Sequence, residues 1–540
     1  MNKFAVVVAT LLLVGVADAA KILVLMPVPA KSHFGAYAPL FEELARRGHE
    51  VTVASPFPRK TPLANYTDIV LEDTFPARDS KEFNTFEMRE ASFPMMMYFI
   101  FKICSESCEK VLQLPNMQKL INSKDLEFDL VLYEPFFTEC TYGLLHKFKA
   151  PKIQLVPNSI IPWSGDPVGN PSTLSYIPIL VSDTGSLDFM GRFSNFMQMS
   201  FLVLFRAFIV VPTMDSIMRK YFPDPTIPSI DELETDTAFL FLHSHPVLNN
   251  PRPLTPNTIE LGALHVKEKG KLPQDLQKFL DDAPHGVIYF SLGSNVRSVD
   301  MPEAKRNSFI QAFSKLKQKV LWKWEADSLP GQPKNVRLGK WLPQHDILAH
   351  PNVKLFITHG GLMSTQEATY FGIPLVAVPI MADQKVNALR AENSGYAIVL
   401  DVHNITEESV SWALNQVLNE PRYRENAKRL SSIITDQPQK PLEKAVFWVE
   451  YAIRHGGAPH LRSAALKLNP LQYYFLDVIA VLALIGLAVI VLTTLFVRAA
   501  IKTQRQMETP KDRVSRNIGG GVHKKQWYGR IVSDNKPSRL

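Results

Sequence analysis

The sequence predicts two α/β domains that face each other across a cleft, followed by one C-terminal transmembrane helix. The first observation is that short apolar segments alternate with helical segments in both halves of the 540-residue chain. The second is a Pro-rich connection, residues 245–256, between these halves. The third is an uncharged apolar run, residues 478–497, that has the length of a bilayer span.

The N-terminal segment has the pattern of a secretory signal peptide. Lys3 precedes an apolar run, residues 4–16, and small residues that end at Ala19 follow it. A membrane anchor is the alternative, but the run is about 13 residues long and a span needs about 20. We therefore expect cleavage after Ala19, which removes residues 1–19 and places the mature chain in a translocated compartment.

The first domain, residues 20–245, is expected to contain a parallel sheet. Its predicted elements are strands at Lys21–Pro27, Val51–Ala54, Leu130–Leu132 and Ile153–Leu155, with a helix at Ala36–Arg47. Gly48 stands directly after this helix, as at many helix C-termini. Continuous apolar strands around a helical segment are typical of a parallel sheet that is buried on both faces.

Two segments of this domain, Phe93–Cys104 and Asp188–Phe222, are rich in Phe and Met and carry few charges. Such side chains adapt to varied apolar ligands. An ordinary helical core, a pocket for a lipophilic molecule and a membrane-facing helix all agree with this composition. Periodicity alone does not separate the three.

A linker, residues 246–280, is expected before the second domain, residues 281–435. The predicted strands of the second domain are Val287–Ser291, Lys319–Lys323, Leu355–Thr358, Leu375–Val378 and Ala397–Leu400. Two of these strands end in Gly-containing turns, residues 291–294 and 358–364, before a helix. Such turns present backbone N–H groups and let a phosphate approach closely, so two of them in one domain indicate an anion site.

The run 478–497 is read as a transmembrane helix, with Tyr473, Tyr474 and Arg498 as interface anchors, and a buried core helix is the alternative. The tail, residues 498–540, carries 11 Lys and Arg against three acidic residues, which predicts a cytosolic location by the positive-inside rule. The rest of the chain holds 48 basic and 49 acidic residues, so the excess of positive charge is confined to the tail. We expect anionic lipid beside the tail and no nucleic-acid partner.

Cysteines and glycosylation patterns also bear on the compartment. Three cysteines in 540 residues do not form a disulfide framework, so a packed core must stabilise the chain. The triplets that begin at Asn65 and Asn404 match the N-glycosylation pattern. In the expected topology both asparagines lie on the luminal side.

The most specific pattern spans Trp341 to Gln384. It consists of Trp341-Leu342-Pro343-Gln344, His359-Gly360-Gly361, Glu367, Pro374 and Pro379-Ile380-Met381-Ala382-Asp383-Gln384. This segment closely resembles the signature of the UDP-glycosyltransferases, a family that includes the UDP-glucuronosyltransferases and their insect and plant relatives. The resemblance covers nearly the whole chain, and several features are similar to the insect branch.

The resemblance implies a GT-B fold, in which two Rossmann-like domains face a cleft and the C-terminal one binds a UDP-sugar donor. It also implies that a crossing helix within residues 436–470 returns to pack on the N-terminal domain before the juxtamembrane segment. Neither a cofactor nor a metal ion is expected. Hydrogen-bond donors and a helix N-terminus supply the positive potential that a diphosphate needs.

The resemblance assigns a role to each donor-site residue. Trp341 stacks on the uracil and Gln344 contacts the uridine, although a core aromatic is the alternative reading of Trp341. Glu367 accepts hydrogen bonds from the ribose, and Asp383 and Gln384 bind sugar hydroxyls. The residues implied around the diphosphate are Gly293, Ser294, His359, Gly361 and Ser364.

Catalysis is implied to depend on His33, which follows the first strand and removes the proton of the acceptor hydroxyl. Most relatives use an Asp to orient this imidazole, at the position where this chain has Glu134. Glu139, within a turn of Glu134, is the alternative partner. A further departure is Met363, where many relatives carry Asn, so a side-chain contact to phosphate is not expected there. The implied reaction is a direct displacement at the anomeric carbon, with inversion.

The expected activity is transfer of a hexose, glucose or alternatively glucuronic acid, to a small lipophilic acceptor. The expected location is the endoplasmic reticulum membrane, with a single-pass type I topology and luminal domains, and a homo- or hetero-oligomer stays open. One rival hypothesis is a non-catalytic, membrane-tethered UDP-sugar-binding protein or partner subunit, against which His33 argues. The other is a receptor that signals through the tail, against which the flexible glycine run 519–521 argues.

Overall fold

The computed structural model describes residues 19–72, 74, 92–171, 173, 175–179, 188–267, 270–294 and 296–507. The chain divides into two compact units, the first ending at Leu466 and the second beginning at Lys467. The predicted signal peptide, apart from Ala19, and the part of the predicted tail from residue 508 onward lie outside the described residues.

The first sheet has seven parallel strands in the order β3-β2-β1-β4-β5-β6-β7. Its strands are β1 Lys21–Leu25, β2 Glu50–Ser55, β3 Tyr66–Val70, β4 Leu130–Tyr133, β5 Lys152–Val156, β6 Thr237–Leu242 and β7 Thr258–Glu260. All residues of β4, β5 and β6 are buried, as expected for central strands that helices cover on both faces. Because β1 and β4 are neighbours, the residues that follow these two strands meet at one edge of the sheet.

The helices of the N-terminal domain are α2 Lys31–Arg46, α4 Phe93–Gln113, α5 Pro115–Asn122, α6 Gly143–Phe148, α7 Pro162–Gly165, α8 Phe189–Phe205, α9 Val211–Tyr221 and α10 Ile230–Thr235. A short 3-10 turn, η1 Glu139–Thr141, follows β4, and a π-helical segment, η3 Arg206–Val210, joins α8 to α9. Along α2, Tyr37, Leu40, Phe41 and Leu44 are buried at helical spacing. Their packing in the core of the first sheet fixes the first turn of α2 at the edge of that sheet.

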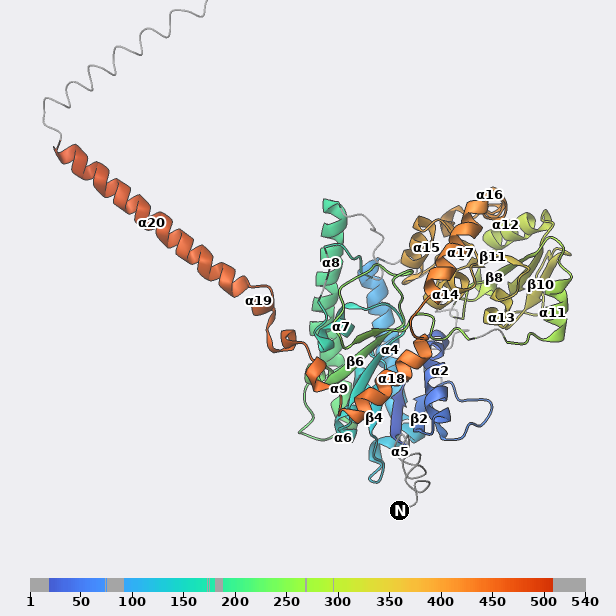
Figure 1. The fold of residues 1–540 in the computed structure, drawn as a ribbon, viewed down its shortest axis with the longest axis horizontal. Helices are drawn as coiled ribbons and strands as arrows, with labels where there is room; N and C mark the ends of the chain where they lie inside the picture. The colour runs from blue at the N-terminus through green and yellow to red at the C-terminus, as the bar shows by residue number, and fades with distance from the viewer. Residues whose placement is uncertain are drawn as a thin grey trace, which may run out of the picture. The chain divides into compact units, whose positions relative to one another are not determined.

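The second sheet has six parallel strands in the order β10-β9-β8-β11-β12-β13. Its strands are β8 Val287–Ser291, β9 Lys319–Lys323, β10 Val336–Gly339, β11 Val353–Thr358, β12 Leu375–Ala377 and β13 Ala397–Val399. The helices of this domain are α11 Gln274–Asp281, α12 Glu303–Ser314, α13 Gln344–Leu348, α14 Leu362–Tyr370, α15 Gln384–Asn393, α16 Glu407–Asn419 and α17 Pro421–Thr435. Two parallel sheets with helices between their strands confirm the predicted α/β fold (Figure 1).

Some element bounds differ from the expectations. Sequence reasoning did not identify β3, β6, β7 or β10, of which β3, β7 and β10 are short strands at sheet edges. The range 246–280, expected as a linker, contains β7 of the first sheet and α11. Helix α2 begins at Lys31 rather than at Ala36, so His33 belongs to the first helical turn and not to the preceding loop.

A C-terminal helix, α18 Pro441–Arg454, packs on the N-terminal domain, as the resemblance implies. Its buried face, which includes Val446 and Val449, joins the same core as α2. Trp448 packs against Phe239 of β6 with ring centroids 5.1 Å apart. The orange ribbon of α18 accordingly lies among the blue and green elements of the N-terminal domain in Figure 1.

The Phe-rich segment forms a continuous helical stretch, Phe189–Tyr221, that is long and apolar enough to cross a membrane. One side of this stretch, with Met214 and Met218, is fully buried in the core of the domain. On the other side Phe189 and Phe208 are among the most exposed apolar residues of the N-terminal domain. The segment is therefore partly a core helix and partly an exposed apolar surface.

The second unit contains two helices, α19 Pro470–Tyr473 and α20 Leu476–Met507. α20 has 32 residues, includes the predicted span 478–497, and buries none of its side chains. Its length and composition fit a membrane span. The run therefore remains a candidate membrane span.

Candidate active site

The first turn of α2 carries His33, and the end of β4 carries Glu134. Since β1 and β4 pair in parallel, with Leu25 opposite Tyr133, the residues beyond both strands lie side by side. The imidazole Nδ1 of His33 lies 2.5 Å from Oε1 of Glu134, whose side chain is fully buried. The ring of Phe136 meets the imidazole edge-on, with centroids 5.0 Å apart. A carboxylate at Nδ1 leaves Nε2 as the imidazole nitrogen that can take a proton from a bound molecule.

The alternative partner, Glu139, is engaged elsewhere. Its Oε1 accepts a hydrogen bond of 2.7 Å from Nη1 of Arg206, and the Nη2 group of the same guanidinium lies 2.6 Å from Oε2 of Glu234. All three side chains are largely or wholly buried. Arg206 is the first residue of the π-helical segment η3. The geometry therefore brings Glu134, and not Glu139, to His33.

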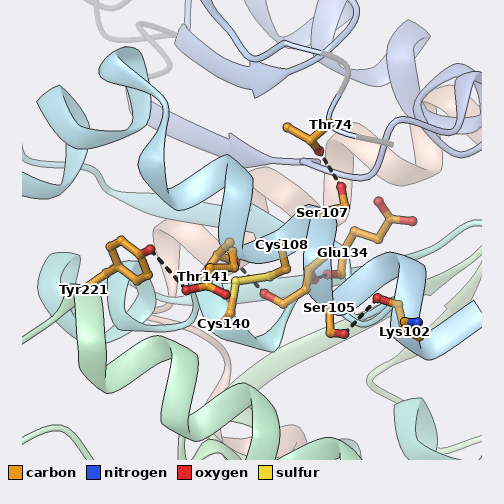
Figure 2. The surroundings of a disulfide bond; sticks show 11 residues. Thr74, Lys102, Ser105, Ser107, Cys108, Glu134, Cys140, Thr141 and Tyr221 are labelled. Carbon is orange, nitrogen blue, oxygen red and sulfur yellow. Dashed lines mark hydrogen bonds between the residues drawn. A yellow bond between two sulfur atoms is a disulfide. The ribbon is translucent and has the colours of Figure 1, made fainter. Parts of the chain in front are cut away.

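A disulfide bond fixes the loop that carries both acids. Cys140, directly after Glu139, is bonded to Cys108 of α4. Figure 2 shows Glu134 among the side chains around this bond. The hydroxyl of Thr138 donates a hydrogen bond to the carbonyl oxygen of Glu134, which closes the loop on itself. Three cysteines gave no indication of this pairing in the sequence, and the third, Cys104, is a buried free thiol.

In the second domain, two glycines flank the imidazole of His359. A Cβ atom on Gly293 would lie 2.5 Å from Cε1 of His359, and one on Gly361 would lie 2.6 Å from Nε2. Gly293 also adopts φ +83°, which favours glycine. Burial, with the nearby charge of Lys323, lowers the pKa of His359 to about 4. His359 is therefore neutral at pH 7, so towards an anion it could serve as a hydrogen-bond donor and not as a cation.

Gln344, Ser364 and Glu367 form a hydrogen-bonded cluster in the same domain as His359. The amide Nε2 of Gln344 donates to Oγ of Ser364 at 3.0 Å and to Oε2 of Glu367 at 2.6 Å. Burial raises the pKa of Glu367 to about 7, against the opposing effect of the Gln344 bond. A buried carboxylate with unused acceptor capacity suits the hydroxyl donors of a ribose.

Two buried histidines that sequence reasoning missed, His265 and His243, lie next to this cluster. Nε2 of His265 lies 3.6 Å from Oε1 of Glu367, and the ring of His243 lies 4.8 Å from that of His265. Burial lowers the pKa of His243 to about 3 and that of His265 well below its ordinary value. Both rings are neutral at physiological pH, so they pack behind Glu367 without adding charge.

Trp341 is not a core residue, because 60% of its surface is exposed. The ammonium Nζ of Lys31, the first residue of α2, lies 3.5 Å from the centroid of the indole ring. Ser294 follows Gly293 in the turn after β8 and is half-buried. Lys31 was missed by sequence reasoning, because the predicted helix began at Ala36 and left Lys31 in the preceding turn.

The loop before α15 places Asp383 and Gln384. The amide of Asn387 donates to Oδ2 of Asp383 at 2.7 Å. Burial raises the pKa of Asp383, while Asn387 and the charge of His33 oppose the rise, so the two domains are close enough here to interact. Oε1 of Gln384 accepts from the backbone N–H groups of Ile380 and Met381, at 2.9 and 3.0 Å. The amide nitrogen of Gln384 is therefore the group that can reach a ligand.

Met363 points toward the N-terminal domain. Its Cε atom would lie 3.5 Å from a Cβ atom on Gly35 of α2, and its side chain, like that of Phe34, packs against the core that contains Tyr37. Met363 therefore makes an apolar contact with the N-terminal domain at the position where many relatives are expected to have a polar side chain.

The predicted glycosylation residues Asn65 and Asn404 are both exposed. The amide of Asn65 donates to the carbonyl oxygen of Ala45 at 3.3 Å. Within the described residues, no group of three or more His, Cys, Asp or Glu side chains has an arrangement that could hold a metal ion.

The chain matches the family model described as UDP-glucoronosyl and UDP-glucosyl transferase over residues 20–509. It is 39% identical to UDP-glycosyltransferase UGT5 of Dactylopius coccus, over 91% of this chain and 94% of the relative. It is 36% identical to UDP-glucosyltransferase 2 of the same insect, over 87% and 91%. UDP-glucuronosyltransferase 2B15 of Homo sapiens is 31% identical, over 86% of this chain and 90% of that protein.

Solved structures share the fold. The glycotransferase of kitacinnamycin superimposes with a TM-score of 0.55 at 17% identity, over 81% of this chain and 100% of that one. CalG4, the calicheamicin glycosyltransferase, gives a TM-score of 0.52 at 19% identity, over 82% and 100%. The similarity confirms the GT-B fold that the sequence predicted.

Proposed function

The chain is a member of the UDP-glycosyltransferase family, and from this membership we propose that it transfers glucose from UDP-glucose to a hydroxyl group of a small lipophilic acceptor. Its activity as a UDP-glycosyltransferase follows from the family match over most of its length. The similarity to an insect UDP-glucosyltransferase supports glucose. Glucuronic acid is the alternative sugar, since a human UDP-glucuronosyltransferase is nearly as similar.

The contact between His33 and Glu134 is the observation that carries the mechanism. In the proposed reaction, Nε2 of His33 accepts the proton of the acceptor hydroxyl as its oxygen forms a bond to the anomeric carbon. The bond between this carbon and the β-phosphate oxygen breaks, UDP leaves from the opposite face, and the configuration inverts. The charge of Glu134 stabilises the imidazolium that forms.

In the second domain, different residues are proposed to bind the uracil, the ribose, the diphosphate and the sugar of UDP-glucose. Trp341 stacks on uracil, Gln344 contacts the uridine and Glu367 accepts from the ribose. Asp383 and the amide nitrogen of Gln384 bind sugar hydroxyls. The diphosphate lies in the cradle formed by Gly293, Ser294, His359, Gly361 and Ser364. Neutral His359, backbone N–H groups and the N-terminus of α14 stabilise the leaving UDP, so the proposal requires no metal ion.

We propose a luminal location for both domains in the endoplasmic reticulum membrane. The signal-peptide pattern at residues 1–19, the exposed apolar helix α20 and the basic tail support a single-pass type I topology. In this topology Asn65 and Asn404 are accessible to glycosylation, and the exposed side of Phe189–Tyr221 faces lipophilic acceptors or the membrane.

Membranes that contain the protein, incubated with a panel of UDP-sugars and a generic phenol, test this function. We expect product with UDP-glucose as the best donor, none with His33→Ala, and unchanged UDP binding by that variant. Transfer that persists in His33→Ala refutes the mechanism. The absence of product with every donor supports the rival of a non-catalytic UDP-sugar-binding protein.

A further inference from the structure

Two lysines, Lys31 and Lys323, lie over the indole ring of Trp341. Nζ of Lys31 lies 3.5 Å from the indole centroid, and Nζ of Lys323 lies 5.9 Å from it. Burial lowers the pKa of Lys31, and the charges of Lys60 and Lys323 lower it further. Lys31 comes from the N-terminal domain, whereas Trp341 and Lys323 belong to the domain of the second sheet, so this contact joins the two domains.

Lys31 and Lys323 differ in whether an acidic side chain neutralises their charge. Lys323 pairs with Glu325 at 2.6 Å. In the described part of the chain, Lys31 forms no ion pair with a carboxylate, and its main contact is the indole ring. The positive end of the α2 dipole and the two lysines disfavour a cation at this place. An anion bound nearby would stabilise it.

The same lysines reach the proposed diphosphate cradle electrostatically. Lys323 lies near enough to His359 that its charge contributes to the low pKa of that imidazole. Lys31 in turn feels the charge of Lys323. Trp341, the two lysines and His359 therefore lie in one region of positive potential. A nucleoside diphosphate bound there brings at least two negative charges.

Lys31 and a stacked base compete for one position. Atoms in van der Waals contact with the indole lie about 3.5–4.0 Å from it, and the ammonium of Lys31 already occupies this layer. A uracil ring that stacks on this face must displace the ammonium. With uridine the displaced cation gains nothing, whereas UDP offers it a diphosphate.

We propose that Lys31 is a donor-binding residue whose ammonium lies over the indole of Trp341 and moves to the diphosphate when a uridine diphosphate stacks on this ring. The inference rests on the proposed role of Trp341 in UDP binding. Lys31 stands two residues before His33 in the same helical turn. The donor thereby gains a charged contact from the domain that supplies the catalytic base, and this contact favours a closed cleft.

The proposal predicts effects of opposite sign for two ligands. In Lys31→Met, the dissociation constant of uridine should fall about two- to fivefold, because a competing cation–π contact is lost. The dissociation constant of UDP should rise about threefold or more, because a charged contact is lost. Lys31→Arg, which keeps the charge, should retain the UDP affinity of the natural protein. The KM for the UDP-sugar should rise in Lys31→Met more than kcat falls.

Calorimetric titration of the full chain in detergent micelles, with uridine and with UDP, tests these signs. Lys124→Met, an exposed lysine of the same domain, is the matched control and should change neither affinity. Equal shifts for both ligands, or no shift for uridine, overturn the role of Lys31 while UDP binding by the natural protein stands. A natural protein that binds no UDP refutes the proposed function itself, and this inference with it.

Discussion

Replacing Glu134 by Asp gives this chain the acid that most relatives carry, and we expect it to lower activity. The change removes one methylene, about 1.5 Å of reach. The contact to Nδ1 of His33 would then lengthen from 2.5 Å to about 4 Å, beyond hydrogen-bonding distance. Loss of a hydrogen bond to a charged group costs about 1.5–3 kcal/mol, or roughly 10- to 150-fold in kcat.

The assay is steady-state transfer of the sugar to a phenol, with UDP binding and thermal unfolding measured in parallel. The KM for the UDP-sugar should change little, since Glu134 lies in the other domain. Glu139→Asp is the matched control, because it shortens a buried glutamate by the same amount and weakens its contact with Arg206. We expect Glu139→Asp to lose stability but to keep kcat within about threefold. A Glu134→Asp variant with the natural kcat, or an equal loss in both variants, refutes the assignment.

Three further predictions concern stability and donor binding. Burial raises the pKa of Glu367 from 4.5 to about 7. The stability that the protonated side chain contributes is therefore complete below pH 4.5 and is lost as the pH rises through 7. This loss lowers the free energy of unfolding by about 3 kcal/mol. Melting temperatures of Glu367→Gln should therefore fall less between pH 5 and 8 than those of the natural protein. Replacing Cys108 and Cys140 by Ala opens a 32-residue loop and should lower the free energy of unfolding by about 4 kcal/mol in denaturant titrations. Gly361→Ala, at an ordinary φ of −61°, introduces a clash with the buried His359, so it should weaken UDP binding about tenfold by calorimetry and also lower the melting temperature.

The sheets were predictable where a strand is a continuous apolar run. The strands β1, β8 and β9 begin at the predicted residues Lys21, Val287 and Lys319, because a buried run follows or includes each of these starts. β3 and β10 are partly exposed edge strands with polar residues, so they lack this signal. β6 is fully buried and was nevertheless missed, although Ala238 to Leu242 is a continuous apolar run.

The site was predictable in its residue types and not in its pairings. The sequence favours Glu134 over Glu139 only by its position, and the structure adds that Arg206, far along the chain, engages Glu139 while Glu134 contacts His33. The contact of Lys31 with Trp341 joins two domains and follows from no local pattern. The tertiary fold determines which charged and aromatic groups from distant segments meet. Spacing rules within one helix or strand do not predict such contacts.

The position of α18 makes the acceptor-side domain discontinuous in sequence. Ala445, Val446 and Val449 fill the core of the first sheet although they follow the whole donor-side domain in the chain. A fragment that ends at residue 245 would lack β7 and expose the apolar strip that α18 covers. Chimeras that exchange acceptor specificity between relatives should therefore carry α18 together with the N-terminal segment, since a single crossover between the halves would pair one protein's sheet with another's helix.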